Sequence, residues 1–91
     1  GAAAGYLAAV RRATAVPLAT ARTARAASHR LQALRAKVRA SIASDLTTAL
    51  ALLDAAATGA LANVAINLPD LAAAGGDTGP IDIEARALGS R

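Results

Sequence analysis

Residues Ser44–Pro69, SDLTTALALLDAAATGALANVAINLP, carry the longest helical pattern in this chain. Ser44 is predicted to be the N-cap of the helix and Asp45 to lie in its first turn, because both side chains suit the positive end of a helix dipole. Pro69 is predicted to end the helix, since proline lacks the backbone N–H donor. Apolar side chains recur at spacings of three and four, which places them on one helix face: Leu46, Leu50 and Leu53.

The residues before this helix predict a second helical arm. Ala2–Ala15 is expected to be helical, and Pro17 is expected to break or kink the chain. Residues 17–40 then predict another helical stretch, because apolar side chains again share one face. A turn is expected around Ala40–Ser44, where this pattern weakens.

The segment after Pro69 is rich in glycine. AAAGGDTGP, residues 72–80, predicts a loop. PIDIEARAL, residues 80–88, predicts a short helix with Pro80 at its first position, and an extended arm is the alternative. We therefore divide the chain into a helical segment, residues 1–71, and a loop with a short C-terminal helix or arm, residues 72–91.

The composition limits how large a core this chain can build. Nearly a third of its 91 residues are alanine, it has no Phe, Trp, Met or Cys, and Tyr6 is its one aromatic residue. Alanine favours helices but adds little apolar area, and a chain this short buries only about 60–65% of its unfolded surface. We expect an all-α, antiparallel helical bundle, completed by dimerisation or by a missing N-terminal segment.

The residue types argue against several classes of site. One histidine and no cysteine make a metal site or a disulfide unexpected. Charges interrupt every apolar run before it reaches the roughly 18–20 residues of a membrane span, so no membrane partner is expected. The start of the chain lacks a signal-peptide pattern, and we expect a cytoplasmic protein. His29 is interpreted as a surface histidine, with a general base as the alternative.

Charge is distributed unevenly along the chain. Residues 1–44 hold eight basic side chains and no acidic one, whereas residues 45–91 hold two basic and six acidic ones. Helices of opposite charge that face water and each other would explain this pattern, and so would an anion-binding surface. Nucleic acid is the disfavoured anion, because the basic segment has no aromatic side chain for stacking and few amides for base edges.

Two asparagines stand out within the apolar end of the long helix. Asn63 and Asn67 are four residues apart, so they share a helix face. A buried amide without a hydrogen bond costs roughly 1–3 kcal/mol, so both side chains need partners. They could satisfy backbone groups at a helix end, bond across an interface, or hold a polar ligand, and spacing alone leaves these alternatives open.

Three short blocks, in this order, resemble a known family: ATAVPL (Ala13–Leu18), SD (Ser44–Asp45) and GALANVAINL (Gly59–Leu68). Their pattern is similar to the formiminotetrahydrofolate cyclodeaminase and methenyltetrahydrofolate cyclohydrolase family. That family typically carries an A-T-x-V-P-L helix, an S-D at the start of the next helix, and an N-V-R-I-N-L helix end. The resemblance covers roughly Tyr6–Leu71 and corresponds to the second half of the family's domain.

The resemblance implies an all-α dimer that acts on a tetrahydrofolate derivative as its substrate, without a metal. The implied reaction is either loss of ammonia from the 5-formimino form or hydrolysis of the 5,10-methenyl bridge. By the same resemblance, Asp45 would be the catalytic residue, and Ser44, Asn63 and Asn67 would bind the substrate. The basic residues could then attract the anionic polyglutamate tail of cellular folates.

This sequence departs from the family pattern at three places. Ala65 stands where the family has the arginine of N-V-R-I-N-L, and residues 38–41 replace a G-N-P-N loop. The Gly-rich N-terminal motif of the family is absent from the chain. A non-catalytic helical dimerisation module on the same scaffold is therefore the alternative to an enzyme or a fragment of one.

Overall fold

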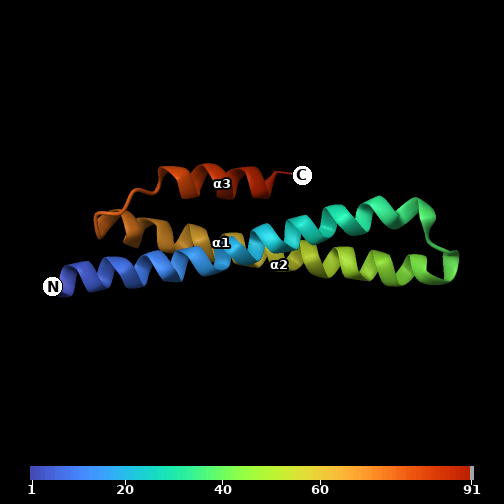
Figure 1. The fold of residues 1–91 in the computed structure, drawn as a ribbon, viewed down its shortest axis with the longest axis horizontal. Coiled ribbons are helices and arrows are strands. Elements are labelled where there is room, and N and C mark those ends of the chain that lie inside the picture. The colour runs from blue at the N-terminus through green and yellow to red at the C-terminus, as the bar shows by residue number, and fades with distance from the viewer. Residues whose placement is uncertain (91) are drawn as a thin grey trace.

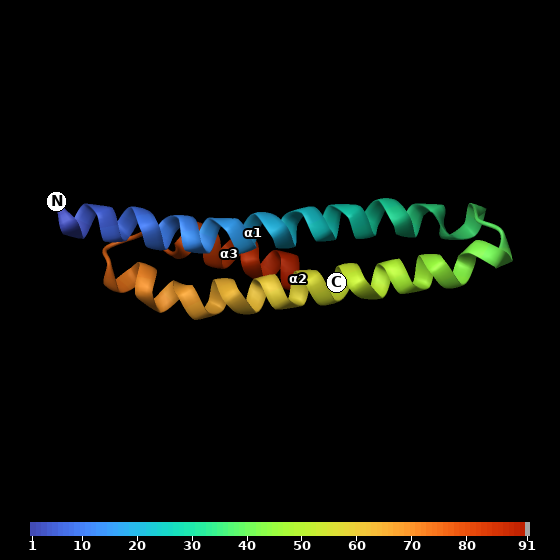
Figure 2. The same cartoon turned by 90° about the horizontal axis from the view of Figure 1, so that it is seen from below.

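The computed structural model describes residues 1–90, which form a long helical hairpin with a short third helix against it (Figure 1). Helix α1 spans Ala2–Leu34, α2 spans Ala40–Ala73 and α3 spans Gly79–Gly89. The principal extents are 58 × 19 × 15 Å, so the molecule is an elongated rod. Seen after a turn of 90°, α1 and α2 run side by side, and α3 lies lengthwise over the seam between them (Figure 2). The predicted all-α antiparallel arrangement is confirmed.

Pro17 was predicted to break or kink the first helix, and it does not break it. Helix α1 continues through it to Leu34. A proline within a helix leaves the carbonyl four residues earlier without its usual N–H donor, and here that carbonyl belongs to Ala13. The side chain of Asn67 on α2 donates to the Ala13 carbonyl at 3.0 Å. The hairpin thus supplies the hydrogen bond that the proline removes.

Helix α2 begins four residues before the predicted N-cap. Arg39 occupies the N-cap position, with extended backbone, and its carbonyl accepts hydrogen bonds from the N–H groups of Ile42 and Ala43. The chain reverses through a short 3₁₀ turn at Arg35–Lys37 rather than at Ala40–Ser44. Ser44 and Asp45 therefore lie inside the helix and exposed, and neither caps it. No glycine or proline separates residue 40 from Ser44, so nothing in the backbone prevents the earlier start.

Pro69 also lies inside a helix, which corrects the predicted end of α2. The helix continues to Ala73 and closes at two glycines. The N–H of Gly76 donates to the Leu71 carbonyl at 2.9 Å, and the N–H of Gly75 donates to the Ala72 carbonyl at 3.0 Å. These two bonds form a Schellman motif, which needs a residue with positive φ, and Gly75 supplies it with φ of 93°. Glycine rather than proline ends this helix.

The seam between α1 and α2 is narrow and built largely from small side chains. The buried positions are Leu18, Ala21, Ala24, Leu46, Ala57, Ala60, Val64 and Leu71, with Thr14 as the one buried polar residue among those described. The Thr14 hydroxyl donates to the Val10 carbonyl at 2.8 Å, so its burial leaves no unpaired donor. Alanine lets the two helices approach closely but gives each contact little apolar area. The hairpin consequently leaves much of its apolar surface uncovered.

Helix α2 carries part of that uncovered apolar surface. Leu52 is 66% exposed and Ile66 is 69% exposed, although both lie in the most apolar part of the chain. By length and composition alone, α2 is apolar enough to cross a membrane, and 17% of its most apolar stretch is buried. The expectation that charges interrupt every such candidate is therefore wrong, although core helices of soluble proteins meet the same two criteria. Helix α2 therefore presents apolar side chains that the rest of residues 1–90 leaves exposed.

Candidate functional site

A groove runs between α1 and α2 beside Pro17, and it joins two of the three sequence blocks. Its volume is about 660 Å³. Pro17 and its neighbours form one wall, and Asn63 and Asn67 stand on the other. We call this site the asparagine groove, and its residues are Ala13, Val16, Pro17, Thr20, Ala55, Ala56, Gly59, Ala60, Asn63 and Asn67.

The two asparagines have different environments in this groove. Asn67 is half-buried and uses its amide N–H to bind the Ala13 carbonyl. Asn63 is exposed, and its amide forms no hydrogen bond to another described residue. Of the alternatives left open by spacing, Asn67 thus satisfies a backbone group, while Asn63 presents both a donor and an acceptor to the groove.

The part of the groove that α2 contributes is flat, because its side chains there are small. Gly59 lies on this surface between Ala55, Ala56 and Asn63. A Cβ added at Gly59 would meet no atom within 4 Å, so no neighbouring helix of this chain explains the glycine. A helix-interior glycine costs roughly 1 kcal/mol relative to alanine. The open backbone at Gly59 is available to a ligand or to a second protein surface.

Ser44 and Asp45 do not belong to this groove. Asp45 lies near the hairpin turn, about 27 Å from Asn63 along α2 at a rise of about 1.5 Å per residue. Within one chain, the four residues that the family resemblance matched therefore fall into two groups at opposite parts of one helix. A site that uses both groups requires a second chain.

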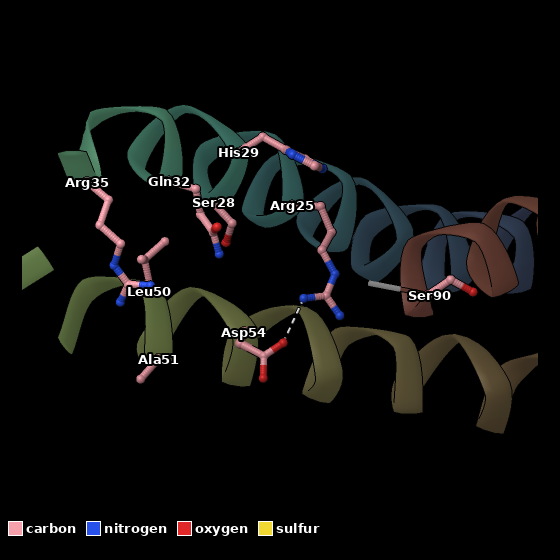
Figure 3. Close-up of a pocket in the computed structure, with 9 residues that line it drawn as sticks. All are labelled: Arg25, Ser28, His29, Gln32, Arg35, Leu50, Ala51, Asp54 and Ser90. Carbon is pink, nitrogen blue, oxygen red and sulfur yellow. Dashed lines mark hydrogen bonds and ion pairs between the residues drawn. The ribbon is translucent and has the colours of Figure 1, made fainter. Parts of the chain in front are cut away.

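A second cavity, which we call the polar pocket, lies between α1 and α2 nearer the hairpin turn (Figure 3). Its volume is about 460 Å³. Ser28 and Gln32 extend from α1 toward α2, and Arg35 reaches across beside Leu50 (Figure 3). The complete lining is Arg25, Ser28, His29, Gln32, Arg35, Leu50, Ala51, Asp54 and Ser90. His29 is exposed at this pocket, in line with its interpretation as a surface residue.

Arg25 connects all three helices at one end of the polar pocket. Its side chain is 15% exposed, and Nη1 lies 2.7 Å from Oδ1 of Asp54 on α2. Its Nε donates to the Leu88 carbonyl in the last turn of α3 at 2.7 Å. The carbonyls of the last helical turn have no partner within the helix, so a cation there is favourable. Arg25 therefore fixes the position of α3 as well as the spacing of the hairpin.

A second ion pair holds the middle of α3. Arg22 donates to both carboxylate oxygens of Glu84, at 2.7 and 2.8 Å. The hydrogen bond from Arg22 lowers the pKa of the Glu84 carboxyl, and the same bond raises the pKa of the Arg22 guanidinium. Because this pair faces solvent, it orients α3 more than it stabilises the fold.

Sequence reasoning missed Arg25 and Asp54 as a pair, although a signal for them was present. Asp54 is the one acidic residue between Leu46 and Pro69, on an otherwise apolar stretch. A carboxylate in such a place is expected to pair with a basic side chain. Asn67 faces Ala13 in the antiparallel hairpin, and the same register brings Asp54 opposite Arg25. The register itself was the information that the sequence lacked. No cluster of three or more potential metal-ligating His, Cys, Asp or Glu side chains occurs among residues 1–90.

The hydrogen bond between Asn67 and Ala13 gives a testable coupling with Pro17. Asn67→Ala is expected to lower the free energy of unfolding by about 1 kcal/mol in the native background. In a Pro17→Ala background its cost should approach zero, because the restored N–H of residue 17 can bond the Ala13 carbonyl. Urea denaturation of the four chains measures the coupling, and Asn63→Ala is the matched amide control. Equal costs of Asn67→Ala in both backgrounds would contradict the assignment.

Comparison with known proteins places this architecture in a family. A family model described as formiminotransferase-cyclodeaminase matches residues 3–75, which include α1, α2 and the asparagine groove. No curated protein and no solved structure matches the chain. Helix α3 lies beyond the matched residues. The chain belongs to the formiminotransferase-cyclodeaminase family.

Proposed function

We propose that this chain acts in folate one-carbon metabolism, as a cyclodeaminase or cyclohydrolase on 5-formimino- or 5,10-methenyltetrahydrofolate. The observation that carries the proposal is the asparagine groove, in which the Pro17 block and the Asn63–Asn67 block form opposite walls. Family membership supplies the chemistry, and the groove supplies a place for the ligand.

The asparagine groove suits a pterin ring in size and in the nature of its walls. Its volume of about 660 Å³ falls within the range of small-molecule sites, roughly 300–1,000 Å³. The small residues Gly59 and Ala60, next to Asn63, offer a flat apolar surface for one ring face. A pterin edge alternates hydrogen-bond donors and acceptors, and the amide of Asn63 can match one of each. In this proposal Asn67 positions the Pro17 wall through the Ala13 carbonyl, and Asn63 contacts the ligand.

Asp45 enters this site from a second copy of the chain. The exposed face of α2 has a large side chain, Leu52, close to the small side chains of Ala55 and Ala56. An antiparallel pairing of two α2 helices centred near Asp54 would set Leu52 against the partner's Ala55 and the partner's Ala56. The same register would bring Asp45 opposite the partner's Asn63. A homodimer would thus both cover the apolar face of α2 and complete the folate site.

The role proposed for Asp45 is proton transfer at the bridging carbon. In cyclodeamination the second folate nitrogen bonds to the formimino carbon and loses its proton. The amino group on that carbon accepts a proton, its bond to the carbon breaks, and it leaves as ammonia. In hydrolysis a water molecule adds to the methenyl carbon and loses a proton. One carbon–nitrogen bond of the bridge then breaks, the released nitrogen takes up a proton, and a formyl group remains on the other nitrogen. A positioned carboxyl group can transfer these protons, and such groups contribute typically 10²–10⁴-fold to rate. Ser44, next to Asp45, would hydrogen-bond the substrate.

The basic half of the chain has a matching role. Residues 1–44 carry eight basic and no acidic side chains, which would attract the anionic polyglutamate tail of a cellular folate. The proposal requires no metal and places the protein in the cytoplasm, where folate polyglutamates occur. Chelation with EDTA should then leave folate binding unchanged.

A non-catalytic dimerisation module is the second candidate, and a specific observation favours it. Asp45 and Asn63 lie about 27 Å apart along one helix, at about 1.5 Å per residue, and Ala65 stands where the family has arginine. If the two α2 helices pair in another register, the chain still folds and dimerises, but Asp45 does not reach the partner's Asn63 and the site is incomplete. This candidate expects a stable dimer that is indifferent to folates.

Isothermal titration with 5-formyltetrahydrofolate, mono- and polyglutamylated, tests the proposed site. We expect saturable binding that weakens at least tenfold on Asn63→Ala, a loss of about 1.4 kcal/mol. Thr58→Ala removes an exposed polar side chain of α2 that lines neither cavity and serves as the control, with an expected change below about twofold. Analytical ultracentrifugation establishes the dimer in the same samples. A folded, helical dimer that binds neither folate would overturn the proposal in favour of the dimerisation module.

A further inference from the structure

The polar pocket interrupts the packing of the hairpin seam. Along α1, the seam positions toward the N-terminus are filled by Leu18, Ala21 and Ala24, all of them buried. The same helix face continues at spacings of three and four to Arg25, Ser28 and Gln32, and there the seam opens into about 460 Å³. A helix pair that only needed to pack would place apolar side chains at these positions, as it does one turn earlier.

The charges around the polar pocket are unequal. Asp54 is paired with Arg25, whose guanidinium also binds the Leu88 carbonyl. Arg35 enters from the opposite end, and its one side-chain hydrogen bond to a described residue is a long contact of 3.5 Å from Nη2 to the Thr47 hydroxyl. It forms no ion pair within residues 1–90. The pocket therefore contains one neutralised ion pair and one guanidinium whose donors remain available.

Neutral donors stand beside that guanidinium. The hydroxyl of Ser28 and the amide of Gln32 point from α1 into the same gap, between Arg35 and the Arg25–Asp54 pair (Figure 3). A guanidinium presents its N–H groups as a planar fork that fits two oxygens of a carboxylate or phosphate. A hydroxyl and an amide can complete the coordination of such an anion. These groups share one ligand chemistry, a small oxyanion.

The polar pocket is also distinct from the asparagine groove. Leu88, whose carbonyl binds Arg25, lies in the last turn of α3, and Ser90, which lines the polar pocket, is the C-cap residue of that helix. This segment lies outside residues 3–75, to which the family match extends. The polar pocket shares no lining residue with the asparagine groove.

We propose that the polar pocket binds a small oxyanion, a phosphate or a carboxylate, with Arg35 as its main cation and Ser28 and Gln32 as hydrogen-bond donors. The site is independent of the folate proposal. Inorganic phosphate and glutarate are suitable probes, because they carry the two kinds of oxyanion in small molecules. Binding of phosphate alone assigns the pocket to phosphorylated ligands, and binding of glutarate alone assigns it to carboxylates.

Titration of the full chain with each probe, without folate and at constant ionic strength, tests the proposal. Arg35→Gln is expected to weaken binding at least tenfold, because it removes the charged fork. Arg30→Gln makes the same change of net charge at an exposed arginine of α1 outside the pocket, and it should weaken binding less than about threefold. Asn63→Ala should leave oxyanion binding unchanged, which separates this site from the folate site.

A second variant tests whether the open seam itself is the site. Gln32→Leu places an apolar side chain against Leu50 in the gap, so it should abolish oxyanion binding while circular dichroism shows a fully helical chain. The proposal is overturned if neither probe binds saturably, or if Arg30→Gln and Arg35→Gln weaken binding equally. Equal effects would mean that the whole basic helix attracts anions without a defined pocket.

Discussion

Replacing Leu71 with alanine is expected to lower the free energy of unfolding by about 2–5 kcal/mol. Leu71 is 1% exposed and is one of the largest fully buried side chains among those described. Its side chain also packs against the turn that ends α2. Gly76 packs so closely that an added Cβ would lie 2.5 Å from Cδ1 of Leu71. Small domains are stable by only about 5–15 kcal/mol, so this change removes a large share.

Urea denaturation followed by circular dichroism measures this loss. Leu34→Ala is the matched control, since Leu34 is 47% exposed at the hairpin turn and its truncation should cost less than about 1 kcal/mol. A comparable loss for both leucines would show that Leu71 is not part of a core in solution. Measurement at several protein concentrations separates the stability of the hairpin from that of a dimer.

The helical character of the chain could be predicted from its sequence, but the ends of the helices could not. Pro17 and Pro69 were both predicted to interrupt helices, and both lie inside them. The rule against proline is a local one, because it counts the hydrogen bond lost within the helix. At Pro17 a tertiary contact from Asn67 replaces that bond, and the sequence does not identify such a partner. The short helix beginning near Pro80 was predicted, since its signal is local.

The position of the hairpin turn was hidden for a related reason. Residues 35–39 contain neither glycine nor proline, yet the chain reverses there through a 3₁₀ turn and an extended residue, Val38. If the position of the turn is unknown, the register of α1 against α2 is unknown too. The contacts of Arg25, Asp54 and Asn67 then cannot be predicted. Sequence spacing did place Asn63 and Asn67 on one face. Asp45 and Asn63 both lie on the continuous helix α2, so they are far apart within one chain. The second prediction rests on this distance.

Mixing two inactive variants is expected to restore folate turnover. Asp45→Ala and Asn63→Ala should each lower turnover of the 5,10-methenyl bridge at least about 100-fold, the lower end of the range for acid–base groups and binding residues that position a substrate. In the proposed antiparallel dimer, each site takes Asp45 from one chain and Asn63 from the other. Random exchange of equal amounts makes half of the dimers mixed, and each mixed dimer has one intact site. About a quarter of the native turnover should therefore return.

The matched control mixes Asn63→Ala with Asn67→Ala. These two residues lie in the same groove of the same chain, so each site of a mixed dimer still lacks one amide. Turnover of this mixture should not exceed the mean of the two variants measured separately. Fluorescence transfer between labelled chains confirms that the subunits exchange in both mixtures. If exchange occurs and the Asp45→Ala and Asn63→Ala pair stays inactive, Asp45 and Asn63 do not meet in one site. In that case no partner chain would bring Asp45 close to Asn63, and the two residues would remain about 27 Å apart along α2, at about 1.5 Å per residue. Asp45 could then not act on a ligand held at Asn63.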